Sequence, residues 1–160
     1  MKSFTQINEL KKQHIFSRFL TSRTKLIIEC IAALFILLFF YTALNKTLEI
    51  DKTVVAIWQT PGLSKYATAI AWTIVIFEYI VTIMLFIPNT RKLGLYASLF
   101  MMLSFTAYII YMKTVLNDLP CSCGGVISKM SWNQHLLFNI VLSILGFFSI
   151  YLIRIQPRAN

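Results

Sequence analysis

The chain has 160 residues, of which 58% are hydrophobic and 13% are charged, with a formal net charge of +9. An average soluble domain is about half apolar and about a quarter charged, so this composition excludes a disordered chain and a disulfide-packed mini-protein and argues against a soluble globule. It also argues against a nucleic-acid partner, because the basic residues must first be assigned to the two sides of a membrane.

The first 25 residues are basic and carry interspersed apolar side chains. They predict a cytoplasmic amphipathic segment, 1–25, that lies on the anionic face of a membrane. The alternative is that its charges only fix the topology. The segment is too long for the n-region of a signal peptide, and the apolar run after it is too long for an h-region. We therefore interpret that run as an uncleaved membrane span.

Four apolar runs are each long enough, at ~1.5 Å per residue, to cross a hydrocarbon core of ~30 Å. Backbone polar groups in lipid must be satisfied within their own segment, so the runs are predicted to be helices. The sequence predicts an all-α membrane protein, a four-helix transmembrane bundle over residues 26–153 with a cytoplasmic tail at 154–160. The predicted spans are 26–44, 66–87, 93–112 and 136–153.

The basic residues are divided unevenly between the two ends of this bundle. The N-terminal segment, the loop between the second and third spans and the tail hold most of them. The positive-inside rule then places both termini in the cytoplasm. The loops 45–65 and 113–135 face outward, and the predicted location is a bacterial inner membrane with these loops in the periplasm. The outer side carries Lys46, Lys52, Lys65, Lys113 and Lys129.

The connections also carry predictions. The short polar segment 88–92 is typical of a tight turn, so the second and third spans should be antiparallel neighbours. In the first outer loop, a possible Asp51 cap precedes apolar residues at near-helical spacing, which predicts a short interfacial helix with Trp58 at headgroup level. These apolar residues are Ile50, Val54, Ile57 and Trp58.

The second outer loop contains Cys121 and Cys123, followed by Gly124 and Gly125. In the predicted topology this pair faces an oxidising compartment, where disulfides form and persist. Cysteines at i and i+2 close only a small ring, and strained, exposed disulfides are the labile or catalytic ones. The glycines allow backbone angles that other residues resist. The pattern predicts thiol–disulfide exchange, with a metal site or a structural pair as alternatives.

Three polar or aromatic residues follow at the start of the fourth span. A positively charged His135 near a cysteine would favour the thiolate, which is the attacking form, over the thiol. The alternative is that His135 is an interfacial residue that caps the helix. Trp132 is an interface anchor. Asn139 shares a helical face with His135 and could hold the imidazole ring or form a hydrogen bond across helices.

A copper or zinc site would draw on Cys121, Cys123 and His135, since thiolates suit soft metals. A closed structural zinc site needs four ligands, and the only nearby fourth candidate is Asp118. The Cys-x-Cys spacing also differs from the usual spacing of zinc ligands. No metal ligand set is therefore assigned.

Glu78 lies near the middle of the second span. A carboxyl at this depth is a functional-site hypothesis by default, and burial should make it at least partly neutral and a hydrogen-bond donor. It could relay protons or contact a bound quinone. The alternative is a packing hydrogen bond to the third span, for which the candidates are Ser104, Thr106 and Tyr108.

Glu29 and Cys30 lie at the cytoplasmic end of the first span. Glu29 can reach Arg91 or Lys92 and is favoured by the helix N-terminus. Cys30 lies too far from the outer side to pair with the Cys-x-Cys residues. We interpret it as a small apolar residue.

The whole pattern resembles the MauE/DoxX-like family of small bacterial membrane proteins. The resemblance covers about residues 25–153: four spans, the outer segment 48–63, the acidic residue Glu78, and the strings PCSCGG at 120–125 and MSWNQHLLFN at 130–139. This cysteine–glycine–tryptophan–histidine string is similar to that of members from Bacteroidetes-type bacteria.

The resemblance implies a role in the maturation of disulfide-containing periplasmic proteins, with a thioredoxin-like periplasmic protein or thiol substrate as partner. The expected function is disulfide exchange through Cys121 and Cys123, which would make the protein a thiol–disulfide oxidoreductase. One alternative is a non-catalytic subunit of a membrane complex that docks a partner protein. Another is thiolate handling of copper or zinc.

Overall fold

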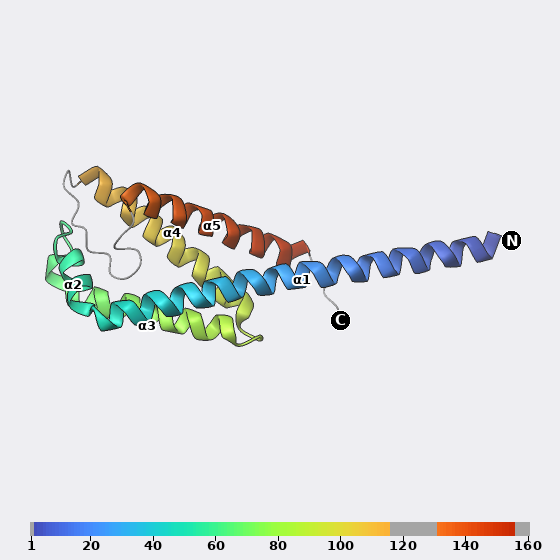
Figure 1. The fold of residues 1–160 in the computed structure, drawn as a ribbon, viewed down its shortest axis with the longest axis horizontal. Helices are drawn as coiled ribbons and strands as arrows, with labels where there is room; N and C mark the ends of the chain where they lie inside the picture. The colour runs from blue at the N-terminus through green and yellow to red at the C-terminus, as the bar shows by residue number, and fades with distance from the viewer. Residues whose placement is uncertain (1, 116–130, 156–160) are drawn as a thin grey trace.

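The computed structural model describes residues 2–115 and 131–155, with side chains from Arg23 to Thr114 and from Ser131 to Ile155 apart from Trp132. Figure 1 shows that this part of the chain consists of helices joined by short turns. Its elements are α1 (Lys2–Leu48), α2 (Ile50–Trp58), the short 3-10 helix η1 (Ser64–Tyr66), α3 (Ala67–Phe86), α4 (Arg91–Val115) and α5 (Trp132–Ile155).

Four segments in the described residues are long and apolar enough to cross a membrane. This confirms the predicted all-α membrane protein with a four-helix transmembrane bundle, and each predicted span overlaps one of the four segments. The segments are Arg23–Leu48, Ser64–Phe86, Arg91–Thr114 and Asn133–Ile155.

The bundle consists of two helix pairs. Helix α1 packs along α3, and α4 packs along α5, and the two pairs meet closely at the turn that joins α3 to α4 (Figure 1). From this turn the pairs diverge toward the end of the bundle that carries α2. We call that end the α2 end.

Apolar side chains lie both inside and outside the bundle. The interior contains Phe35, Phe39 and Leu85, which are almost fully buried. Leu37, Phe86 and Phe100 have more than half of their surface exposed on the outside. An apolar exterior of this kind is suited to lipid, where helices associate mainly through packing and polar contacts.

The connection between α3 and α4 is the predicted tight turn. The Thr90 hydroxyl donates to the Met84 carbonyl oxygen at 2.8 Å, and Arg91 Nε donates to the Leu85 carbonyl oxygen at 3.2 Å. Arg91 also pairs with Glu29 of α1, with 3.8 Å between Nη1 and Oε1. The predicted contact of Glu29 with a basic residue of this turn is thus confirmed, and Cys30 beside it is a free, exposed cysteine.

Helix α2 lies against α3. Its buried Ile57 packs on Ala67 and Ala71, whereas Trp58 is exposed. The predicted Asp51 cap is wrong: the helix begins at Ile50 after Glu49, without a side-chain cap, and Asp51 lies inside its first turn. An acidic side chain in that turn is still favourable, because it faces the positive end of the helix dipole.

Helix α1 is continuous from Lys2 to Leu48, so residues 2–25 extend the first span without a break. In Figure 1 its N-terminal part projects beyond the bundle at the end opposite α2, where α5 also ends. Contact of this segment with a membrane face stays a prediction.

Gly94 lies where α4 approaches the end of α3 most closely. A Cβ added there would stand 2.9 Å from the backbone nitrogen of Leu85, which cannot move without shifting α3. We expect Gly94→Ala to lower the free energy of unfolding by about 1–3 kcal/mol. Gly146→Ala is the matched control, because its nearest neighbour is a Leu99 side-chain carbon at 3.4 Å. Equal unfolding midpoints of the two variants in detergent would contradict this account of the turn.

Candidate functional site

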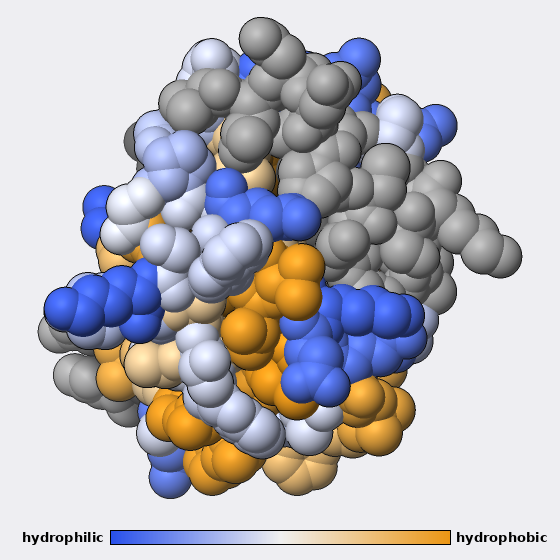
Figure 2. Space-filling model, turned by 90° about the vertical axis from the view of Figure 1, so that its left-hand side faces the viewer, coloured by the Kyte–Doolittle hydropathy of each residue, from blue (hydrophilic) through white to orange (hydrophobic). Residues whose placement is uncertain are grey.

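A cavity of about 430 Å³ lies between the diverging helix pairs, and all five α-helices contribute to its lining. Its walls are mostly apolar, with aromatic side chains from α3, α4 and α5. Figure 2 looks at the α2 end and shows apolar surface flanked by hydrophilic residues. The volume falls within the range of ~300–1,000 Å³ that is typical of small-molecule sites.

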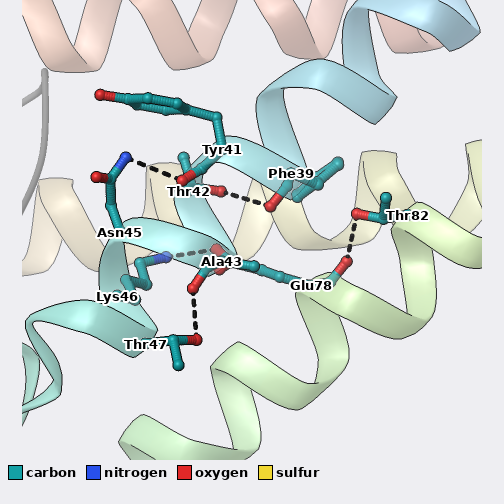
Figure 3. A network of polar contacts seen from close by, with 9 residues as sticks. All are labelled: Phe39, Tyr41, Thr42, Ala43, Asn45, Lys46, Thr47, Glu78 and Thr82. Carbon is teal, nitrogen blue, oxygen red and sulfur yellow. Dashed lines mark hydrogen bonds and ion pairs between the residues drawn. The ribbon is translucent and has the colours of Figure 1, made fainter.

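The main polar feature of the cavity is an ion pair between α1 and α3. The Lys46 ammonium group donates to Oε1 of Glu78, and both side chains line the cavity (Figure 3). The Glu78 side chain is 1% exposed and that of Lys46 is 23% exposed. A second link between the same helices joins the hydroxyls of Thr47 and Tyr79 at 3.3 Å.

The hydrogen-bond partner of Glu78 differs from the candidates that the sequence offered. Glu78 is buried as expected, but its partner is Lys46 of α1 and not a hydroxyl of α4; the Ser104 and Thr106 hydroxyls donate to carbonyl oxygens within their own helix. In the pair with Lys46, Glu78 Oε1 is the acceptor, because a lysine ammonium can only donate.

The second carboxylate oxygen of Glu78 lacks a hydrogen-bond partner among the described residues. Oε2 is buried, whereas Oε1 receives the Lys46 ammonium group. Lys46 Nζ also lies 4.8 Å from the centroid of the Phe105 ring, a cation–π contact on the cavity wall. A buried acceptor without a donor is unfavourable, and the Thr42 side chain, which also lines the cavity, is a further polar neighbour of the Glu78 carboxyl.

Thr60 joins the end of α2 to α4 beside the cavity. This residue follows α2, is 1% exposed, and its hydroxyl lies 3.0 Å from that of Tyr108, which lines the cavity. The Thr60 hydroxyl also contacts the sulfur of Met112 at 3.5 Å. Thr60 thereby holds the end of α2 against α4.

The first turn of α5 is fixed by a capping box. The Ser131 backbone nitrogen donates to Oε1 of Gln134 at 2.9 Å, and the Gln134 backbone nitrogen donates to the Ser131 hydroxyl at 3.3 Å. Such reciprocal bonds satisfy two backbone donors that would otherwise lack partners. They define the start of α5, one turn before His135.

His135 and Asn139 both line the cavity. Asn139 is buried, and its Nδ2 donates to the His135 backbone carbonyl oxygen at 3.0 Å. This hydrogen bond stays within α5. Through it Asn139 neither bonds to another helix nor holds the imidazole ring, which were the two roles that we expected. Its contact stays local because the carbonyl four residues earlier lies within reach on the same helix face.

The structure thus brings Glu78, His135 and Asn139 together around one cavity, although Glu78 is far from the other two in sequence. Cys121, Cys123, Gly124 and Gly125 lie outside the described residues, as does the side chain of Trp132. The flanks of the segment that holds the cysteines both stand at the α2 end (Figure 1). These flanks are joined by a hydrogen bond from Lys113 Nζ to Oδ1 of Asn133.

The described residues contain no group of three or more histidine, cysteine, aspartate or glutamate side chains that could hold a metal ion. The proposed copper or zinc ligands include Cys121 and Cys123, so this finding does not bear on that alternative.

Sequence reasoning missed Lys46 in the site and Thr60 beside it. Lys46 was considered only as one of the basic residues on the outer side of the membrane, and Thr60 was not singled out. A signal for Lys46 did exist, because a lysine within the outer turn of one span can neutralise a carboxylate buried in the next. Nothing in the composition around Thr60 distinguishes it from an ordinary loop residue.

Comparison with known proteins places the chain in a family. No curated protein and no solved structure matches it. A family model described as methylamine utilisation protein MauE matches residues 24–152, which cover nearly all of the four membrane spans and every residue that lines the cavity. The chain therefore belongs to the MauE family of membrane proteins.

Proposed function

We propose that this protein exchanges disulfides with periplasmic proteins through Cys121 and Cys123, and so supports their maturation. The observation that carries the proposal is the placement of His135 and Asn139 on a cavity at the α2 end, where the flanks of the cysteine segment also stand. Membership of the MauE family supports a role as a membrane accessory protein. The proposed partner is a thioredoxin-like protein or another thiol protein on the outer side.

The proposed chemistry is a reversible exchange in two steps. A thiolate of the partner attacks the Cys121–Cys123 disulfide, forms a mixed disulfide with one cysteine and releases the other as a thiolate. The partner's second thiolate then attacks the mixed disulfide. The partner loses two electrons and two protons and gains a disulfide, while this chain gains a dithiol. In the reverse direction the same steps reduce the partner.

His135 is the proposed assisting residue, because a positive imidazolium near a cysteine stabilises the attacking or leaving thiolate. It lies in the second turn of α5, a few residues after the cysteine segment, and Asn139 bonds to its backbone. Trp132, Gly124 and Gly125 are proposed supporting residues, the first as an interface anchor and the glycines as hinges of the segment.

The proposal requires the α2 end of the bundle to face the oxidising side of an inner membrane. In a protein whose native cysteines are replaced, Gln59→Cys in the α2 loop should react with an impermeant maleimide added to spheroplasts. Asn89→Cys in the opposite turn should react only after the membrane is permeabilised. Both residues are exposed, so burial does not explain a difference. Labelling of Asn89→Cys from outside would place the Cys-x-Cys pair on the reducing side and refute the proposal.

The redox state of Cys121 and Cys123 in growing cells tests the proposal itself. Acid quenching followed by alkylation with a mass-tagged maleimide should reveal both oxidised and reduced pairs, whose ratio shifts within minutes after a dithiothreitol or diamide pulse. Cys30 is replaced by alanine in this experiment, because it is a free, exposed thiol. A pair that stays fully reduced and unresponsive would contradict exchange, and stoichiometric copper or zinc on that pair would favour metal handling.

A further inference from the structure

We propose that the end of the bundle opposite α2 binds an anionic phospholipid, whose phosphate group is held by Lys92 and Tyr96 of α4 and Arg154 of α5. The inference goes beyond disulfide exchange and does not depend on it. It follows from three features of this end: a group of hydrogen-bond donors shared by two helices, positive charge without a neutralising acid, and an apolar surface that continues from the donors into the membrane.

A hydrogen bond joins α4 to α5 at this end. Arg154 Nε donates to the Tyr96 hydroxyl oxygen, with 3.4 Å between the two atoms, and both side chains are exposed. Tyr96 keeps its own hydroxyl proton for a further acceptor, and the two terminal nitrogens of Arg154 have no partner among the described residues. Lys92 is also exposed and lies one turn before Tyr96 on the same face of α4. The three residues therefore present donors on one side of this helix pair.

The positive charge of this group is not neutralised by a carboxylate. Among the side chains that the structure describes, Glu29 is the only acid at this end, and it pairs with Arg91. The other described acids lie at the α2 end or on the cavity: Glu49, Asp51 and Glu78. Lys92 and Arg154 thus favour an anionic ligand. The planar fork of a guanidinium group matches two oxygens of a phosphate, so a phosphate group fits this site well.

The depth of the group in the membrane identifies the source of the phosphate. Lys92 is the second residue of the span Arg91–Thr114, and Arg154 is the last but one of the span Asn133–Ile155. Both lie where phospholipid headgroups meet the hydrocarbon core, a level at which tyrosine is also enriched. In the proposed topology this is the cytoplasmic leaflet, whose anionic lipids attract basic residues.

Exposed apolar and aromatic side chains continue from the group toward the middle of the membrane. Phe100 and Leu103 extend the exposed face of α4, and Phe147 and Tyr151 precede Arg154 on the exposed face of α5. The two helices pack along each other (Figure 1), so acyl chains can lie against both. A phospholipid satisfies the donors and this surface together, whereas a soluble phosphate ester satisfies only the donors.

The test measures lipid binding to the purified full-length protein in detergent by native mass spectrometry. The probes are dioleoyl phosphatidylglycerol, dioleoyl phosphatidylcholine, which has the same phosphate but no net charge, and glycerol 3-phosphate, which has no acyl chains. We expect phosphatidylglycerol to bind about tenfold or more tightly than phosphatidylcholine, because each basic residue near a headgroup favours an anionic lipid several-fold. Millimolar glycerol 3-phosphate should not displace it.

Variants distinguish this site from a general effect of positive charge. The double variant Lys92→Gln/Arg154→Gln should lose the preference, and its unchanged affinity for phosphatidylcholine would show that it is folded. Tyr96→Phe keeps both charges and should weaken phosphatidylglycerol binding about threefold or more, because one hydrogen bond to the phosphate is lost. Lys25→Gln is the matched control: this exposed lysine of α1 lies near the same end, and its loss should leave the preference unchanged.

Four results would overturn the proposal. They are equal affinities of the unaltered protein for the two lipids, a preference that survives in the double variant, a loss in Lys25→Gln as large as in the double variant, and displacement of the lipid by glycerol 3-phosphate. The last result would assign the donors to a soluble phosphate compound.

Discussion

Replacing Lys46 by methionine is expected to lower the free energy of unfolding by about 3–5 kcal/mol, because the Glu78 carboxylate would then be buried without a compensating charge. The Glu78 side chain is 1% exposed and lies between α1 and α3, so it cannot turn to water without separating the helices. This is the largest stability effect that we expect from a single substitution in the described residues.

Glu78→Leu should be less harmful than Lys46→Met. The Lys46 side chain is 23% exposed and lies in the last turn of α1, so its flexible stem can carry the ammonium group to the membrane surface when its partner is lost. The double variant Lys46→Met/Glu78→Leu should recover most of the stability, since replacing a buried pair by apolar residues is often nearly neutral.

The measurement is a double-mutant cycle of unfolding in mixed detergent micelles. The exposed pair between Lys52 and Glu49, with 2.8 Å between Nζ and Oε1, provides the matched control. Surface pairs contribute ~0–1 kcal/mol, so Lys52→Met should have almost no effect. If Lys46→Met is no more destabilising than Lys52→Met, the buried ion pair does not hold α1 against α3.

The fold could be predicted from the sequence wherever the length, apolarity or periodicity of a single segment determines its structure. Length and apolarity predicted the four spans, the polar segment after α3 predicted the turn, and periodicity predicted α2. The contact of Glu29 with Arg91 was predictable because the turn topology puts both residues at one end of the bundle.

The candidate site was less predictable because its contacts join distant segments. Lys46 and Glu78 are 32 residues apart, and no periodicity relates one membrane helix to the rotation of another. Thr60 and Tyr108 are 48 residues apart in the sequence, and their contact could not be predicted for the same reason. The Asp51 cap was wrong because the helix starts one residue earlier than its first acidic side chain, a shift within the ordinary uncertainty of helix ends.

Replacing either cysteine of the pair by serine is expected to abolish net disulfide exchange, because each complete cycle needs both sulfurs. The two single variants should nevertheless differ. In the direction in which this chain reduces a partner's disulfide, loss of the resolving cysteine leaves a mixed disulfide that nothing in this chain can cleave, whereas loss of the attacking cysteine allows no adduct to form. We expect Cys123, which is nearer His135 in sequence, to be the attacking residue.

The mixed disulfide in single-cysteine variants tests the central claim most directly. Non-reducing gels of cells carrying Cys121→Ser or Cys123→Ser in a Cys30→Ala background should show a reducible adduct with a periplasmic thiol protein in one variant only, identified by mass spectrometry of the linked peptides. The account predicts this adduct for Cys121→Ser. If neither variant accumulates an adduct and the wild-type pair binds copper or zinc stoichiometrically, disulfide exchange is wrong and metal handling replaces it.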